Sequence, residues 1–393
     1  MKVQQRLARL RKVRRVVIKI GSGVLGGESG EGLCRDTLKR LVADICALEA
    51  DGRYQVVLVS SGAVMSGRKA LDFPSGMLSI PMKQAAAAVG QVNLMNLYGE
   101  YFSQNGRKVA QILLTHGDIE DRTRNLNVRN TITTLLDWKV IPIINENDST
   151  AVDEIKFGDN DTLSAKIASV VETDLLLILS DVDGLFDSDP RKNPAARLID
   201  EVGINDDLLA VAGDSSTGSG TGGMQAKVKA ARIATDYGVP AWIIGGKTEG
   251  TIRAALREGR GGTFFHPAER GLTAKKHWIL HMLKPKGTIS VDAGAVTAIK
   301  AGKSLLPSGI IGVKGKFEAG EAVAIADGGS TDVARGLVNY GSAEIALIKG
   351  KKSSEIEPAL GFKSYDEVIH RDNMAVLERI TAVHGDMRDT RGE

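Results

Sequence analysis

One stretch of the chain, residues 140–164, restricts its possible folds more than any other. The apolar run 140–144 ends in the four polar residues Asn-Glu-Asn-Asp at 145–148. A buried parallel strand has this pattern where its carboxyl end meets a ligand crevice. Ten residues later, Gly-Asp-Asn-Asp at 158–161 precedes a run of apolar and small residues that predicts a helix over 162–171.

These two polar groups bring together four carboxylates and three amides within a short span. They are Glu146, Asp148, Asp159 and Asp161, with Asn145, Asn147 and Asn160. Burying so many polar groups is costly unless they find partners. A solvated loop with an Asx turn and an aspartate at a helix N-terminus is the alternative interpretation. Two such groups around one strand end, with glycine turns elsewhere in the chain, favour a binding site.

Strands and helices alternate on both sides of this stretch. Apolar runs predict strands over 16–20, 55–59, 109–114, 175–179 and 241–244. Longer amphipathic or Ala-rich segments predict helices over 36–50, 83–102 and 122–138. Such alternation predicts an α/β fold, a three-layer αβα sandwich with a mostly parallel central sheet.

A lysine lies inside the first predicted strand. Lys19 is followed at once by a glycine turn at 21–23, so its amine and the exposed amides of the turn would attract an anion such as a phosphate. An edge-strand lysine that extends to water is the alternative. The turn is not a Walker motif, because Gly-x-x-x-x-Gly-Lys-Ser/Thr is absent from the chain.

A second lysine follows a second glycine-rich segment. Residues 218–223 contain four glycines, and Lys227 lies in the first turn of the helix predicted after them. Free amides at a helix N-terminus bind anions, so the segment suits a triphosphate. A flexible linker is the alternative, but the strand–helix alternation resumes immediately at 241–244. Ser61, in the small-residue turn 60–63, and Ser180-Asp181, after the apolar strand 175–179, end two further predicted strands.

Composition places limits on partners and location. The chain has 393 residues, enough for two or three domains, and its net charge of +3 is too small to imply a polyanionic partner for the whole chain. The spacing of Cys34 and Cys46 suits neither a metal knuckle nor a disulfide, so a reducing cytoplasm is expected. No apolar run approaches the roughly 18 residues of a membrane span, and no membrane association is expected.

The two ends of the chain differ from its centre. Residues 1–15 are basic and are expected to form a solvated extension helix. Between 275 and 377 the pattern predicts a small β-barrel domain, with strands at 278–282, 288–291, 310–314, 322–326, 333–338 and 345–348. Residues 275–316 contain eight lysines and one acid, but RNA binding is not favoured, because interleaved aromatic residues are missing. Residues 378–393 form a polar tail.

Six motifs occur in a diagnostic order: Lys19-Ile20-Gly21, Ser61-Gly62-Ala63, the polar groups at 145–148 and 158–161, Ser180-Asp181, and Thr221-Gly222-Gly223-Met224 with Lys227. In this the chain strongly resembles the amino acid kinase family, and within it the enzymes that phosphorylate glutamate. The resemblance covers 16–266. Residues 275–377 resemble the PUA domain that many of these enzymes carry, and 267–274 would be a linker.

The resemblance implies a role for each matching position. Lys19 and Lys227 would contact the transferring phosphate, and Asp161 would orient both amines. Ser61, Asp148 and Asn160 would bind glutamate. ATP-binding positions would be Lys19, Gly21, Ser180, Asp181, Thr221, Gly222, Gly223, Met224, Gln225, Ala226 and Lys227. No residue is assigned to a metal, because Mg²⁺ is expected on the ATP phosphates.

The implied reaction is ATP-dependent phosphorylation of the γ-carboxylate of L-glutamate to L-glutamate 5-phosphate plus ADP. This is the first step of proline biosynthesis, and the resemblance also implies feedback inhibition by proline and a homo-oligomer. Three alternatives stay open. They are a sister kinase acting on acetylglutamate, aspartate, carbamate or UMP, an RNA-binding protein with a vestigial kinase domain, and a regulatory amino-acid sensor. The presence of both lysines and of Asp161 favours an active kinase over the last two.

Overall fold

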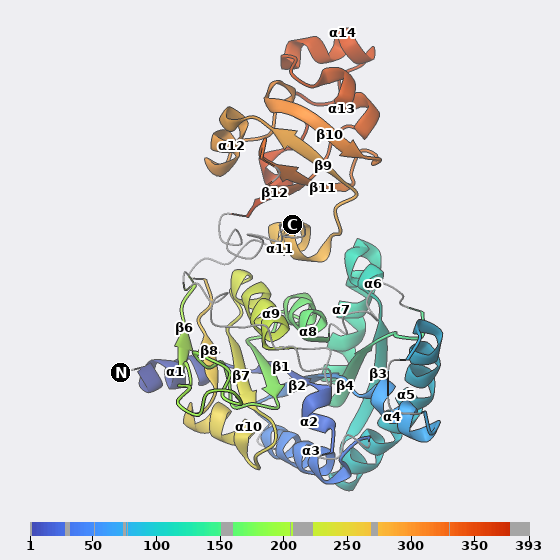
Figure 1. Ribbon diagram of the computed structural model, residues 1–393, viewed down its shortest axis with the longest axis vertical. Helices are drawn as coiled ribbons and strands as arrows, with labels where there is room; N and C mark the ends of the chain where they lie inside the picture. Colours follow the sequence, from blue (N-terminus) through green and yellow to red (C-terminus); the bar gives the residue numbers. More distant parts are fainter. Residues whose placement is uncertain are drawn as a thin grey trace, which may run out of the picture. The chain divides into compact units, whose positions relative to one another are not determined.

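The computed structural model divides the chain into two compact units, residues 1–271 and 272–393 (Figure 1). It describes residues 2–27, 32–50, 52–73, 76, 78–150, 160–204, 206, 223–268, 274–329 and 331–377. Among the described helices, none combines the length and the hydropathy that a membrane crossing requires.

Unit 1 is built on an eight-stranded sheet in the order β3-β4-β2-β1-β5-β7-β8-β6. The strands are β1 Arg15–Ile20, β2 Gln55–Ser60, β3 Lys108–Leu114, β4 Val140–Glu146, β5 Leu175–Ser180, β6 Glu201–Val202, β7 Ala241–Gly245 and β8 Thr263–Phe265. Neighbouring strands are parallel except for the antiparallel pair β7 and β8. The prediction of a mostly parallel α/β sheet is confirmed.

Helices cover both faces of this sheet (Figure 1). They are α1 Lys2–Leu10, α2 Ser22–Leu25, α3 Arg35–Glu49, α4 Ala63–Ala70, α5 Ile80–Gln104, α6 His116–Glu120, α7 Arg122–Asp137, α8 Asn160–Val170, α9 Met224–Asp236 and α10 Thr251–Arg253, which a π-helical turn Ala254–Glu258 extends. Val16, Ile18 and Ile20 pack in the core together with residues of α3, α5 and α10. Because side chains alternate along a strand, Lys19 faces the opposite layer, which contains α8 and α9.

The N-terminal extension is helical, but the expectation that it is solvated is wrong. Arg6 is only 2% exposed, donates to the Gly259 carbonyl at 3.2 Å and forms an ion pair with Glu201 at 2.9 Å. Its guanidinium also lies 5.2 Å from the centroid of the Trp242 ring. Leu10 is buried as well. Because basic residues dominate the composition of this segment, the sequence does not indicate which few side chains anchor it to the rest of unit 1.

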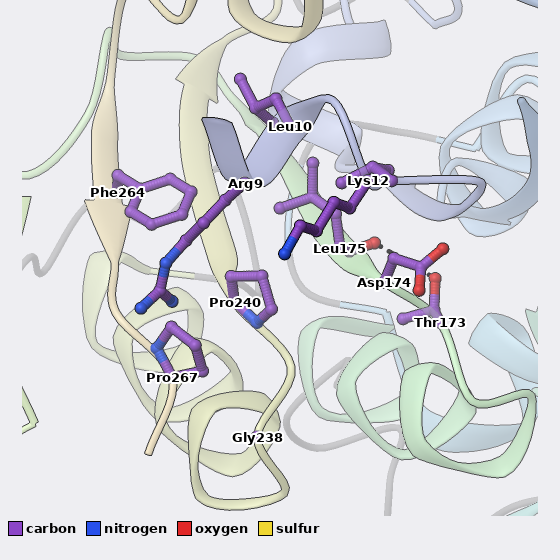
Figure 2. A pocket seen from close by; sticks show the side chains of 11 residues that line it. Arg9, Leu10, Lys12, Thr173, Asp174, Leu175, Gly238, Pro240, Phe264 and Pro267 are labelled. Carbon is purple, nitrogen blue, oxygen red and sulfur yellow. Dashed lines mark hydrogen bonds between the residues drawn. The ribbon is translucent and has the colours of Figure 1, made fainter. Parts of the chain in front are cut away.

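Next to this anchor, unit 1 has an open pocket of about 310 Å³ at the amino ends of the central strands. Figure 2 shows Arg9 beside Phe264 and Pro267, with Lys12 and Asp174 also lining the pocket. Arg9 and Lys12 are both exposed. The polar groups singled out in the sequence lie instead at the carboxyl ends of the strands, so this pocket is separate from them.

Helices α4 and α5 cross at unusually close range. A Cβ atom added at Gly67 would lie 1.7 Å from the Ala86 carbonyl oxygen, and one at Gly90 would lie 1.8 Å from the Ala63 carbonyl oxygen. Only glycine fits at these two positions, because the opposing atoms belong to the backbone and cannot turn away. The crossing fixes the position of α5 relative to the start of α4.

We therefore expect Gly67→Ala to destabilise unit 1 by about 3 kcal/mol or more, the range of severe overpacking. The matched control is Gly99→Ala on α5, where an added Cβ meets nothing within 4 Å. That change should stabilise the protein by roughly 0.5–1 kcal/mol, because alanine favours a helix over glycine. Urea denaturation measures both effects, and equal stability of the two variants would contradict the close crossing.

Unit 2 contains a five-stranded sheet in the order β10-β9-β11-β12-β13. The strands are β9 Gly287–Val291, β10 Ile310–Gly315, β11 Ala322–Ala326, β12 Asp332–Leu337 and β13 Met374–Val376. The helices include α11 Ala274–His277, α12 Ala293–Lys300, α13 Ser342–Ile348 and α14 Ile356–Leu360, with 3-10 turns at Pro307–Gly309, Ser353–Glu355 and Arg371–Asn373. The predicted second, strand-rich domain is confirmed.

Two of the predicted strands in unit 2 are wrong. The segment Trp278–Met282 is a π-helical turn, and 345–348 belongs to α13. Short apolar runs do not distinguish a strand from a buried helical turn. The start of α13 carries a better signal, because the Glu344 carboxylate accepts a hydrogen bond from the Gly341 N–H at 2.8 Å. This hydrogen bond from the N-cap backbone to the third helical residue is one half of a capping box and is typical of a helix N-terminus.

Candidate active site

Lys19 lies near the carboxyl end of β1, the strand between β2 and β5. Its side chain is 4% exposed, and its Nζ is 2.6 Å from Oδ1 of Asp161. The alternative of an edge-strand lysine that extends to water is therefore wrong. A buried amine in a central strand needs a charged partner, and Asp161 provides it.

Asp161 is the second residue of α8 and is shared by two lysines. Lys227, in the first turn of α9, places its Nζ 3.9 Å from Oδ2 of the same carboxylate. Burial lowers the pKa of Lys227, the charge of Asp161 opposes this shift, and the charge of Lys19 adds to it. The amines of Lys19 from β1 and Lys227 from α9 therefore converge on one buried carboxylate.

Glycine turns surround the two amines. Gly21 precedes α2, and a Cβ added there would lie 3.2 Å from the Lys19 Nζ, so a larger residue would crowd the amine. Gly223 caps α9 without a side-chain hydrogen bond, and Met224, Gln225 and Ala226 form the first turn. The first amides of such a turn are suited to phosphate oxygens. Thr221 and Gly222 lie outside the described residues.

The end of β5 adds two polar side chains. Ser180 is buried, and its Oγ is 3.4 Å from Oδ1 of the neighbouring, exposed Asp181. A Cβ added at Gly23 would lie 3.4 Å from Cγ of Asp181, so the turn after β1 and the turn after β5 are neighbours. The predicted ATP-binding residues Gly21 and Asp181 therefore lie on adjoining turns.

A separate polar group lies between β2, β4 and α8. The Nδ2 of Asn160 donates to Oγ of Ser61 at 3.1 Å and to Oδ1 of Asn145 at 2.9 Å. Within the described residues, Oδ1 of Asn160 is buried and has no hydrogen-bond partner. Asp148, half-buried just beyond β4, has its pKa raised to about 6 by burial. Two predicted substrate residues, Ser61 and Asn160, are thus in direct contact.

Sequence interpretation missed one member of this group. Gln91 of α5 is 9% exposed, and its Oε1 accepts from Nδ2 of Asn145 at 2.8 Å. Asn145 belongs to the polar group after the apolar run, but the sequence assigns no role to it. The available signal for Gln91 is a polar residue next to Gly90 on the otherwise apolar face of α5.

Comparisons with known proteins agree with this geometry. The model of the amino acid kinase family matches residues 14–245, and that of the PUA domain matches residues 287–360. This chain belongs to the amino acid kinase family. The glutamate 5-kinase of Geobacter metallireducens is 51% identical over 95% of this chain and 100% of its own length, and that of Syntrophus aciditrophicus is 48% identical over 94% and 96%.

The family membership confirms the resemblance found in the sequence, including its glutamate 5-kinase branch and its PUA domain. A solved UMP kinase from Bacillus anthracis aligns with 65% of this chain and 96% of its own at 20% identity and a TM-score of 0.45. The curated glutamate 5-kinases align with nearly the whole of this chain and of their own length, which supports its being a kinase.

Proposed function

We propose that this chain transfers the γ-phosphoryl group of ATP to the γ-carboxylate of L-glutamate, yielding L-glutamate 5-phosphate and ADP at the start of proline biosynthesis. The observation that carries the proposal is the convergence of Lys19 and Lys227 on Asp161, at 2.6 Å and 3.9 Å. The identity of about 50% to glutamate 5-kinases over nearly the whole chain supports the choice of glutamate.

The chemistry requires charge neutralisation rather than a general base. A glutamate γ-carboxylate has an ordinary pKa of about 4.3, so it is an ionised nucleophile at neutral pH. The barrier is the approach of this anion to polyanionic ATP. Lys19 and Lys227 would neutralise the transferring phosphoryl group, and Asp161 would keep both amines charged and aimed.

For the nucleotide, the support is the pair of neighbouring turns at Gly21 and Asp181 and the helix start at 223–227. Backbone amides there would cradle phosphate oxygens, with Ser180 among the proposed contacts, together with Thr221 and Gly222, which lie outside the described residues. Mg²⁺ would enter on the ATP phosphates and reduce their charge.

For the amino-acid substrate, the support is the polar group around Asn160. Its Oδ1 lacks a partner within the described residues and would accept from the α-ammonium group. Asp148 would supply the opposite charge, and Ser61 a further polar contact. Such an arrangement selects a free α-amino group, because an acetylated nitrogen carries no positive charge.

A substrate panel tests the proposal. ADP release would be followed with glutamate, N-acetylglutamate, aspartate, carbamate and UMP, and the acyl phosphate product would be trapped with hydroxylamine. We expect turnover with glutamate and formation of a hydroxamate. Turnover of N-acetylglutamate but not of glutamate would reject the proposed substrate and select a sister kinase.

Asp148 makes glutamate binding depend on pH. Because its pKa is raised to about 6, Asp148 loses its negative charge as the pH falls through that value. We expect KM for glutamate to rise about tenfold between pH 7.5 and pH 5, with KM for ATP changing less. Asp148→Asn should have a high KM at every pH, and a pH profile identical to the wild type would exclude the assigned role.

The same raised pKa affects stability. A carboxyl with a higher pKa in the folded state adds stability below its unfolded pKa of about 3.8, and this contribution is lost as the pH rises through about 6. At pH 7.5 Asp148→Asn should therefore melt no lower than the wild type. A lower melting temperature would indicate that Asp148 has a structural partner.

Further properties follow from the family and belong to the proposal. Proline would compete at the glutamate site, since its cationic amine suits Asp148, and inhibition unaffected by glutamate concentration would reject this. A homo-oligomer would cover exposed apolar side chains such as Val92, Leu126 and Trp138, and a monomer by light scattering would reject it. The free thiols of Cys34 and Cys46 suit a cytoplasmic location. RNA binding by unit 2 is not proposed.

A further inference from the structure

Three side-chain amides form a hydrogen-bonded series that ends at Asn160, one of the predicted glutamate-binding residues. Oε1 of Gln91 accepts from Nδ2 of Asn145 at 2.8 Å, and Oδ1 of Asn145 accepts from Nδ2 of Asn160 at 2.9 Å. The exposed fractions of the three residues are 9%, 2% and 7%. Because all three are buried, water does not readily replace these hydrogen bonds, and each amide depends on the next.

One backbone group shows which end of each amide is the oxygen and which is the nitrogen. The Glu146 N–H lies 2.9 Å from Asn145, and since an N–H only donates, the facing atom must be Oδ1. Nδ2 of Asn145 must then face Gln91, whose facing atom must be the acceptor Oε1. On the other side, the same Oδ1 requires a donor, so Asn160 presents Nδ2 to it.

These assignments leave the side-chain oxygen of Asn160, the last of the three amides, without a donor among the residues that the structure describes. With Nδ2 of Asn160 committed to Asn145 and Ser61, its Oδ1 is buried and, within the described residues, unpartnered. An unsatisfied buried acceptor is costly, and a ligand that donates a hydrogen bond would remove that cost. If Gln91 were lost, Nδ2 of Asn145 would lack its acceptor, and the amide would rotate more freely.

We propose that Gln91 is a positioning residue for substrate recognition. Through Asn145 it holds the amide of Asn160 so that Oδ1 accepts from the α-ammonium group of glutamate. This inference rests on the proposed function, because it takes glutamate as the substrate. Gln91 does not touch the substrate itself.

The close crossing of α4 and α5 makes the surroundings of the three amides rigid. Gly90, next to Gln91, packs against the backbone of Ala63, and α4 starts at Ala63, two residues after Ser61. Figure 1 shows α4 and α5 side by side. The same contact therefore positions both Gln91 and Ser61 relative to the end of β4.

Gln91→Met tests the role, since it keeps the length of the side chain and removes the acceptor. We expect KM for glutamate to rise roughly tenfold to thirtyfold, the loss of one hydrogen bond to a charged group, with KM for ATP within about twofold. Gln91→Glu retains an acceptor and should stay within about threefold of the wild type. Gln104→Met, an exposed position on the same helix, is the matched control and should change nothing.

A double-mutant cycle separates positioning from general structural support. In an Asn160→Ala background, Gln91→Met should add no further change in KM for glutamate, because it acts through Asn160. Additive effects, or equal changes in both KM values, would overturn the inference. If Gln91→Met impairs folding in a thermal melt, Gln91→Leu, which also removes the acceptor and fills the space, should likewise raise KM for glutamate while leaving KM for ATP within about twofold.

Failure of this inference is distinguishable from failure of the proposed function. A wild-type protein that neither binds glutamate in calorimetry nor phosphorylates it would reject the function and, with it, the role of Gln91. A wild type that phosphorylates glutamate, together with a Gln91→Met variant of unchanged KM, would reject only the inference.

Discussion

Replacing Lys19 by alanine is expected to lower kcat by about 10²–10³, the cost of removing one donor that stabilises a transition state. The Lys19 amine is buried and lies 2.6 Å from the Asp161 carboxylate, so the substitution removes a positive charge from the interior of the site. The measurement is steady-state ADP release with both substrates at saturation. The variant should also lose on the order of 3 kcal/mol of stability, because a buried carboxylate loses its nearer partner.

Lys108→Ala is the control for this change. Lys108 is also a strand lysine of unit 1, but it is exposed at the start of the edge strand β3. Its removal should leave both kcat and stability unchanged. Near-normal turnover by a folded Lys19→Ala variant would show that the amine does not act on the phosphoryl group.

Asp161→Asn is the second change with a large expected effect, again about 10²–10³ in kcat. The amide keeps the size of the side chain but removes the charge that both lysines share. The pKa of Lys227, already lowered by burial, should fall further without this carboxylate. A lysine with a lowered pKa is charged only at lower pH, so the residual activity of Asp161→Asn should rise between pH 9 and pH 7.

The wild type should show a flatter profile over the same interval, because Asp161 supports the charge of Lys227. Asp36→Asn is the matched control: Asp36 is also an acid in the first turn of a helix, but it is exposed on α3. A parallel pH profile of Asp161→Asn and wild type would contradict the role of Asp161 in keeping the amines charged.

The parts of this site that the sequence predicts share one physical cause. A lysine inside an apolar strand and an aspartate at the start of a buried helix both destabilise the fold unless they are paired, so each predicts a contact with an opposite charge. Lys19 and Asp161 satisfy each other, as that cost requires. The alternation of apolar runs and helices likewise predicts the parallel sheet, since each run is long and regular.

The parts that the sequence does not predict depend on contacts distant in the chain. Gln91 and Asn145 are 54 residues apart, and the sequence around either residue does not predict its contact with the other. Arg6 reads as one of many exposed basic residues, yet it pairs with Glu201 across 195 positions. The turn Trp278–Met282 is short and apolar, and its helical form follows from packing rather than from periodicity.

The most direct test of the account is a crystal structure with ADP, Mg²⁺, glutamate and an aluminium fluoride that mimics the phosphoryl group in flight. We predict Nζ of Lys19 and Nζ of Lys227 at hydrogen-bond distance, about 2.7–3.2 Å, from the fluoride ligands, with Asp161 still between the amines. An arrangement in which either amine points away from the mimic toward solvent would contradict the central claim.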